Sequence, residues 1–193
     1  MCSAQLSLLE PPPASLPDGL QYRPDLITPA EEAALIEEIA ALPFRPFEFH
    51  GYLGNRRTVS FGYRYDFSDQ AVHLAEPISA FLLPLRERAG AFAGLSAGQL
   101  EHALVTEYAP GAGIGWHRDR PVFADVIGIS LGAPCRLRLR RKRGEKWERA
   151  ALSLAPRSAY LLRGPVRHEW QHSIAPMEAL RYSVTFRSKA EPG

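Results

Sequence analysis

Four residues stand at spacings that suit metal chemistry. His117 and Asp119 are two positions apart, and His168 and His172 follow further along the chain. Residues two apart on an extended strand point to the same side. An imidazole and a carboxylate that converge in this way supply two ligands of the 2-His-1-carboxylate triad, which holds Fe(II) and leaves other coordination positions open. The same triplet also occurs as ordinary surface or hydrogen-bonded residues, so further residues must support the metal interpretation.

The segment His168–His172 also matches the HExxH signature of zinc peptidases. That chemistry requires a helix that presents both histidines on one face, with Glu169 beside the metal-bound water. Gly164-Pro165 before the segment and Pro176 after it favour strand, turn and strand instead. A third interpretation, in which both histidines are merely packed or exposed, stays open for the segment taken alone.

The segment Arg181–Arg187 alternates along a predicted strand, with two arginines and two hydroxyls on one side: Arg181, Ser183, Thr185 and Arg187. Such a face is costly to bury without partners. The pattern therefore predicts an anionic partner inside the fold, or else an outward, solvated face. An arginine at this distance from a metal histidine suits the distal carboxylate of a small dicarboxylate whose other end chelates iron.

Short strands dominate the elements that must position these residues. A capped helix is predicted from Thr28 to Leu42, and a second from Pro77 to about Ala91 with a kink or restart at Pro84. A strand at 58–65 would place Val59, Phe61, Tyr63 and Tyr65 together. After Gly94, eight apolar runs indicate strands at 102–108, 114–118, 125–131, 135–141, 147–154, 159–163, 168–174 and 181–187. The predicted class is α+β, mainly β, with N-terminal helices packed outside a jelly roll.

Composition sets the class of protein. The chain has 193 residues, 46% hydrophobic and 23% charged, with a formal net charge of +2, which is globular and gives no global polycation. We expect one domain at 20–188 between tails at 1–19 and 189–193. Two cysteines, no recognisable leader and no spanning segment predict a cytoplasmic protein without a membrane partner, and we expect a monomer.

In its second half the chain resembles the AlkB-like Fe(II)/2-oxoglutarate-dependent dioxygenases. The resemblance covers roughly 105–188 and is carried by these motifs: Tyr108-Ala109-Pro110-Gly111, His117-x-Asp119, Ile129-Ser130-Leu131-Gly132, His172-Ser173-Ile174 and Arg181-Tyr182-Ser183-Val184-Thr185-Phe186-Arg187. It implies a double-stranded β-helix (jelly roll) with its catalytic core at 100–188. It further implies O2 as oxidant and Fe(II) held by His117, Asp119 and His172, which are also the catalytic residues. The implied 2-oxoglutarate contacts are Tyr108, Arg181, Ser183, Thr185 and Arg187.

Two positions depart from the family pattern. Thr106 stands where asparagine is frequent, so one cosubstrate hydrogen bond is absent or made differently. Pro121 stands where several members place an acidic residue near the substrate base, which removes one direct reader of the base edge. The resemblance implies oxidative dealkylation of alkylated nucleobases in DNA or RNA. The alternatives are a 2-oxoglutarate-dependent demethylase or hydroxylase of a protein side chain and, more remotely, a non-catalytic jelly-roll module or the HExxH peptidase.

Two stretches bear on the substrate. Residues 136–149 carry a local charge of about +6, which would bind phosphates in a salt-dependent way, unless it is simply the solvated face of a hairpin. Residues 44–67 interleave aromatic side chains with arginines, and most of the aromatics are assigned to the core. The predicted substrate contacts are Tyr52, Arg56, Arg57, Arg138 and Arg140.

Overall fold

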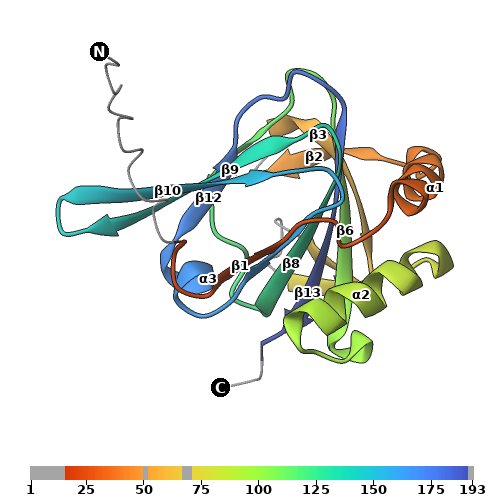
Figure 1. Cartoon of the computed structure of the whole chain (residues 1–193), viewed down its shortest axis with the longest axis horizontal. Coiled ribbons are helices and arrows are strands. Elements are labelled where there is room, and N and C mark those ends of the chain that lie inside the picture. Colours follow the sequence, from red (N-terminus) through yellow and green to blue (C-terminus); the bar gives the residue numbers. More distant parts are fainter. Residues whose placement is uncertain (1–15, 50–51, 67–70, 191–193) are drawn as a thin grey trace, which may run out of the picture.

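Two antiparallel β-sheets form the body of the protein in the computed structural model, which describes residues 16–49, 52–66 and 71–190 (Figure 1). The larger sheet has the order β1-β11-β8-β13-β6-β3-β2 and the smaller β10-β9-β12-β7. The strands of the larger sheet are β1 (Leu20–Arg23), β2 (Arg45–Phe49), β3 (Tyr52–Phe61), β6 (Leu100–Tyr108), β8 (Phe123–Gly132), β11 (Ala159–Leu162) and β13 (Arg181–Lys189). Those of the smaller sheet are β7 (Ile114–His117), β9 (Cys135–Arg143), β10 (Lys146–Leu154) and β12 (Gln171–Ile174).

The strand order is that of a jelly roll. From β6 onward the chain crosses to the other sheet after every strand except β9, which continues into β10 of the same sheet. Strands β6, β8, β11 and β13 therefore lie in one layer, while β7, β9, β10 and β12 lie in the other. The mainly β fold class and the jelly-roll core predicted from the sequence are therefore confirmed. A separate two-stranded sheet joins β4 (Tyr63–Asp66) to β5 (Ala71–Leu74).

Two helices cover the outer face of the larger sheet, on the side of the molecule opposite the β9–β10 hairpin (Figure 1). Helix α1 (Pro29–Ala40) begins at a capping box in which Thr28 and Glu31 exchange hydrogen bonds, as the sequence predicts. Helix α2 (Leu83–Ala93) follows a short 3₁₀ turn, η1 (Ala80–Leu82), and has Pro84 in its first turn. Thus the helix restarts at Pro84, one of the two alternatives predicted, and the segment before it holds only the 3₁₀ turn.

Apolar residues fill two layers. The first lies between the helices and the larger sheet, and includes Ile39, Leu85, Ile129 and Phe186. The second lies between the two sheets, where Leu137 and Leu139 of β9 meet residues of β11 and β12; it comprises Leu20, Tyr108, Ala112, Val126, Leu137, Leu139, Leu154, Tyr160, Leu162, Val166, Trp170, Ile174 and Met177. The site described below lies in this second, inter-sheet space.

Two local predictions need correction. The strand expected at 58–65 breaks at Gly62, whose backbone has φ of +75°, so β3 ends at Phe61 and a new strand starts at Tyr63. The strand expected at 168–174 begins only at Gln171, because Pro165 starts a one-turn helix, α3 (Pro165–Glu169). A short 3₁₀ turn, η2 (Ala97–Gln99), also precedes β6. The predicted tails at 1–19 and 189–193 fall largely outside the described residues.

Among the residues that the structure describes, no helix is long and apolar enough to cross a membrane.

Candidate metal centre

His117, Asp119 and His172 converge in the space between the two sheets. Each offers one ligand atom, and these atoms all lie within 4.8 Å of one another. The two imidazole rings have centroids 4.2 Å apart, and Nε2 of His172 lies 3.5 Å from Oδ2 of Asp119. Two imidazoles and one carboxylate at this separation form a preassembled set of the 2-His-1-carboxylate type.

Strand register explains why residues so distant in sequence meet. His172 on β12 pairs directly with His117 on β7, so the two side chains leave the same face of the smaller sheet. Leu139 on β9 is the opposite neighbour of His172, and it is buried between the sheets. The shared face therefore points inward. Asp119 follows the end of β7 by two residues and continues on the same side.

Arg187 holds the carboxylate of Asp119 in place. Nε of Arg187 donates to Oδ1 of Asp119 at 2.8 Å, and Nη2 lies 2.5 Å from the same oxygen. Burial alone would raise the pKa of Asp119, but the guanidinium of Arg187 keeps that pKa well below its usual value. The carboxylate is thus ionised and keeps Oδ2 directed at the histidine cluster.

Both histidines are neutral at physiological pH, the protonation state that a metal requires. Burial is the main cause of the lowered pKa of His117, and it lowers the pKa of His172 to about 3. Nδ1 of His117 lies 2.9 Å from the carbonyl oxygen of Gly115, so a proton on Nδ1 donates to that oxygen and leaves Nε2 free as a ligand.

The structure separates the two histidines of the HExxH string. His168 and Glu169 lie on α3 and are exposed, whereas His172 lies on β12 and is buried. The two histidines share no helix face, and Glu169 instead pairs with Arg141 at 2.5 Å. The zinc-peptidase arrangement is therefore absent from this segment.

Arg181 lies near the other end of the same inter-sheet space. Its side chain is only 1% exposed, its Nε donates to Oγ of Ser130 at 3.2 Å, and its Cζ lies 5.0 Å from the ring centroid of Tyr108. The Nη1 atom of Arg181 is buried and has no hydrogen-bond partner among the residues that the structure describes. An unpaired guanidinium nitrogen in such a place is costly and indicates a site for an anion.

The remaining odd residues of β13 face the same way. Ser183 and Thr185 alternate with Val184, which packs in the helix-covered core, so both hydroxyls lie on the inter-sheet side with Arg181 and Arg187. The face predicted from the alternating sequence is thus buried, and not solvated.

Sequence reasoning assigned no role to three residues around this site. Ser130 orients Arg181, and His102 contacts Nη1 of Arg187 at 3.2 Å. Arg167 is buried and donates to the main-chain oxygens of Asp119, Arg120 and Phe123. Of the three, only Ser130 could have been found from the sequence, since it belongs to the Ile129–Gly132 motif. His102 and Arg167 contact strands and loops that are distant in the sequence.

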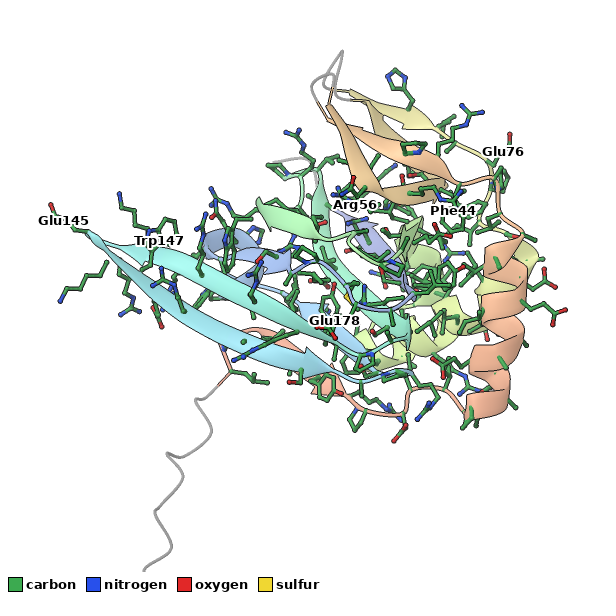
Figure 2. The ribbon with its side chains drawn as sticks, turned by 90° about the horizontal axis from the view of Figure 1, so that it is seen from above. Phe44, Arg56, Glu76, Glu145, Trp147 and Glu178 are labelled. Carbon is green, nitrogen blue, oxygen red and sulfur yellow. The ribbon has the colours of Figure 1, made fainter. Side chains whose placement is uncertain are left out.

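The predicted substrate residues separate into different places. Arg56 stacks on Phe47 at 3.8 Å and is close enough that its charge adds to burial in lowering the pKa of His117. Figure 2 places Arg56 toward the middle of the molecule. Arg57, by contrast, forms a two-bond ion pair with Glu107 at 2.7 and 2.9 Å. The side chain of Tyr52 lies outside the described part of the structure.

Arg138 and Arg140 do not line the metal cluster. They alternate with the buried Leu137 and Leu139 on β9, and Leu139 shares its face with His172. Both arginines therefore leave the smaller sheet on its outer face, away from the three predicted metal ligands.

Comparison with known proteins identifies relatives of the whole arrangement. A family model described as the 2OG-Fe(II) oxygenase superfamily matches residues 19–187. The "Alkylated DNA repair protein ALKBH8 homolog" of Arabidopsis thaliana is 30% identical over 180 residues, covering 81% of this chain and 50% of the relative. The "Probable RNA/DNA demethylase ALKBH6" of Danio rerio is 34% identical over 121 residues, covering 61% and 48%.

Solved structures agree on the fold. The structure of OsALKBH1 superposes with a TM-score of 0.68 at 14% identity, covering 92% of this chain and all of that one. A 2OG-Fe(II) oxygenase family protein from Burkholderia pseudomallei superposes at 0.63 with 16% identity, covering 92% and 88%. The AlkB-like resemblance of the sequence motifs is confirmed. The chain spans about half the length of the two curated relatives named above.

Proposed function

Because the chain belongs to the 2OG-Fe(II) oxygenase superfamily, we propose that it is an Fe(II)- and 2-oxoglutarate-dependent dioxygenase that oxidatively dealkylates alkylated nucleobases in DNA or RNA. One observation carries the proposal. The inter-sheet space holds a His-Asp-His cluster and, on a neighbouring strand, a buried arginine with an unpartnered nitrogen, so it offers sites for a metal and for a carboxylate.

The residues present fit an iron ion. The two imidazoles are neutral, the carboxylate is ionised, and the three ligand atoms lie close together before any ion is bound. This donor set is typical of non-haem Fe(II) oxygenases, which keep open positions for other ligands. His117, Asp119 and His172 would hold Fe(II), with Arg187 fixing the orientation of the carboxylate.

The residues also fit 2-oxoglutarate. Within the described part of the chain Nη1 of Arg181 is a buried donor without a partner, and a carboxylate accepts strong, charge-assisted hydrogen bonds from a guanidinium. Arg181 would hold the distal carboxylate, with Ser130 fixing the guanidinium and Tyr108 packed against it. Ser183 and Thr185 offer hydroxyls on the same side of β13.

When bound, iron with 2-oxoglutarate and O2 supplies the oxidation of a substrate C–H bond. The protein's own residues bind and orient the reacting groups and exclude water from the site. Arg181 and Arg187 neutralise carboxylates inside the fold, and the buried layer around Leu137 and Leu139 excludes water from the site. An oxidised alkyl carbon on a base nitrogen leaves as an aldehyde, which restores the base.

Two observations support a nucleic-acid substrate. The named ALKBH8 and ALKBH6 relatives are described by repair or demethylation of nucleic acids. In this chain Arg56 stacks on the ring of Phe47, and after burial its charge is one of the causes that lower the pKa of His117. Such a pair suits a base and its phosphate.

A mass-spectrometric assay tests the proposal. The full chain with Fe(II), 2-oxoglutarate and ascorbate is offered methylated DNA oligonucleotides, methylated RNA oligonucleotides and methyl-lysine peptides in parallel. We expect succinate formation together with demethylation of at least one nucleic acid, and loss of both in Asp119→Ala. Demethylation confined to the peptides would favour the protein-side-chain alternative and reject the nucleic-acid substrate, whereas succinate-free reactions throughout would reject the dioxygenase.

A further inference from the structure

A continuous basic and aromatic surface lies on the outer face of the smaller sheet. We call it the outer cationic face and define it by the outward residues of β7, β9 and β10: Trp116, Arg136, Arg138, Arg140, Lys142, Trp147 and Arg149. Cross-strand pairing places them together, since Arg140 is opposite Arg149 and Lys142 is opposite Trp147. Figure 2 shows that Trp147 lies on a hairpin that projects well beyond the body of the protein.

The carboxylate of Glu148 on the hairpin does not neutralise this face. Glu148 pairs with Arg141 and Arg143, which alternate with the outward cations and leave β9 on the other side. Within the described residues, neither Arg138 nor Arg140 has a carboxylate partner. Because the whole chain has a formal charge of only +2, the five cations of the outer cationic face make the charge of the molecule strongly one-sided.

Two guanidiniums of this face are held by contacts to side chains of the neighbouring strands. Nε of Arg138 donates to Oγ of Ser173 at 3.1 Å, and Nε of Arg140 donates to Oε1 of Gln171 at 2.8 Å. Arg140 is also sandwiched between Trp116 and Trp147, with its Cζ 4.3 Å from each ring centroid. These contacts fix the side chains, and within the described residues the hydrogen bonds of both arginines involve Nε alone, so the terminal Nη donors remain for another partner. Immobilised donors lose less entropy when they bind an anion.

Repulsion between the cations of the outer cationic face destabilises the folded protein. Like charges directly opposite on an antiparallel pair are destabilising, and Arg140 faces Arg149. Along β9 the outward cations recur every second residue, about 7 Å apart. A row of phosphates would relieve this repulsion along its length. Trp147 adds an indole that is 38% exposed, on which an unpaired base can stack.

We propose that the outer cationic face binds the phosphate backbone of a single-stranded nucleic-acid segment that flanks the substrate base, with one unpaired base stacked on Trp147. The inference rests on the proposed function for the identity of the substrate. The outer cationic face and the metal cluster meet at β7, which is an edge strand of the smaller sheet. Consecutive residues of β7, Trp116 and His117, point to the outer face and to the metal cluster respectively.

Fluorescence anisotropy of a labelled, unmodified U15 RNA and the matching DNA strand tests the proposal with the full chain. We expect log K to fall with log salt by about 0.7 for each phosphate contact. Arg138→Glu/Arg140→Glu should weaken binding on the order of tenfold and reduce the slope by about 1.4. The matched control is Arg23→Glu/Arg45→Glu, which makes the same charge change on the two edge strands of the larger sheet and should have little effect.

Arg149→Glu separates binding from folding. It places an acid opposite Arg140, so the melting temperature should be unchanged or raised while RNA affinity falls. Trp147→Ala should weaken binding by about five- to a hundredfold, and Trp147→Phe should restore most of it because a ring remains for stacking. Equal loss in the edge-strand control, or indifference to Arg149→Glu and Trp147→Ala, would overturn the proposal.

Two further experiments identify the class of partner and show which of the two proposals a negative result rejects. A poly-glutamate peptide that competes as well as RNA, with no dependence on Trp147, would show an acidic-protein surface and reject the nucleic acid. A methylated mononucleoside is too small to reach the outer cationic face, so the face variants should leave its turnover unchanged. If oligonucleotide binding depends on the outer cationic face but no substrate is demethylated, the proposed function is rejected and this inference stands. If the nucleoside is turned over but oligonucleotide binding does not depend on the face, this inference is rejected and the proposed function stands.

Discussion

Arg187 is held between Asp119 on one edge and His102 on the other, with its Nη1 atom 3.2 Å from Nδ1 of His102. His102 is buried and stacks on Phe123, with ring centroids 4.7 Å apart. Burial, followed by the charge of Arg187, lowers the pKa of His102 to about 3. The imidazole is therefore neutral, and Nδ1 accepts a hydrogen bond from Arg187. His102 is a positioning residue that acts on Asp119 through Arg187.

Replacing His102 tests this chain of contacts. His102→Leu leaves Nη1 of Arg187 buried and unpaired, which should cost about 1–3 kcal/mol of unfolding free energy. It should also weaken Fe(II) binding by about 10- to 100-fold, because Asp119 loses its fixed orientation. His102→Asn offers an acceptor and should recover part of the metal affinity, as measured by titration with Fe(II) under anaerobic conditions. Leu and Asn variants with equal metal affinity would show that His102 only packs.

The assignment of His172, and not His168, as the third metal ligand can be tested directly. His117→Ala, Asp119→Ala and His172→Ala should each abolish Fe(II) binding and succinate formation, because each removes one of the three donors found among the described residues. His168→Ala should retain both, since His168 is exposed on α3. Metal content of the purified proteins measures the difference without reference to activity. Iron binding that requires His168 and ignores His172 would contradict the assignment.

Much of this site follows from local sequence patterns. Alternation along Arg181–Arg187 predicts a strand with one polar face, and the buried face of β13 confirms it. Gly164-Pro165 argues against a long helix, and α3 is indeed only one turn. Alternation divides the residues of a strand between two faces, but it does not show which face points to the metal, because that depends on how the strands pair in the sheet. Arg138 and Arg140 thus fall on the far side of the sheet from His172.

Contacts between distant strands could not be predicted from the sequence. His102 and Arg187 lie near the start of β6 and the end of β13, and they meet only because these strands pair antiparallel. The break at Gly62 is similar. The backbone there turns with positive φ beside the main chain of Glu101, where a Cβ atom would lie 2.0 Å from the carbonyl oxygen. Local alternation from Val59 to Tyr65 carries no sign of that approach.

Arg181 should determine which 2-oxoacid the protein uses. Arg181→Ala removes the donor for a distal carboxylate, and the lost charge-assisted hydrogen bonds correspond to about 1.5–3 kcal/mol each, or at least tenfold in KM for 2-oxoglutarate. Pyruvate has no distal carboxylate, so any weak turnover with it should change little. The ratio of kcat/KM for the two oxoacids, measured by O2 consumption, should therefore collapse in the variant. An equal decrease for both would instead indicate a damaged fold.

Tyr160 covers Gly128 across the β8–β11 pair, and the ring leaves no room for a side chain at position 128. The two residues are directly opposite, and a Cβ atom on Gly128 would lie 2.3 Å from the tyrosine ring. Gly128→Ala should therefore force the buried ring aside and cost about 1–3 kcal/mol of unfolding free energy. Tyr160→Ala alone should also destabilise, because it leaves a cavity beside Leu137 and Leu162 in the same core layer.

The double variant distinguishes a steric contact from two independent defects. Once the ring is gone, the new methyl group on Gly128 meets no obstacle, so Gly128→Ala/Tyr160→Ala should be more stable than the sum of the two single losses predicts. Chemical denaturation of all four proteins measures the coupling. Additive losses would show that Gly128 is required for some reason other than the approach of Tyr160, such as its own backbone conformation in β8.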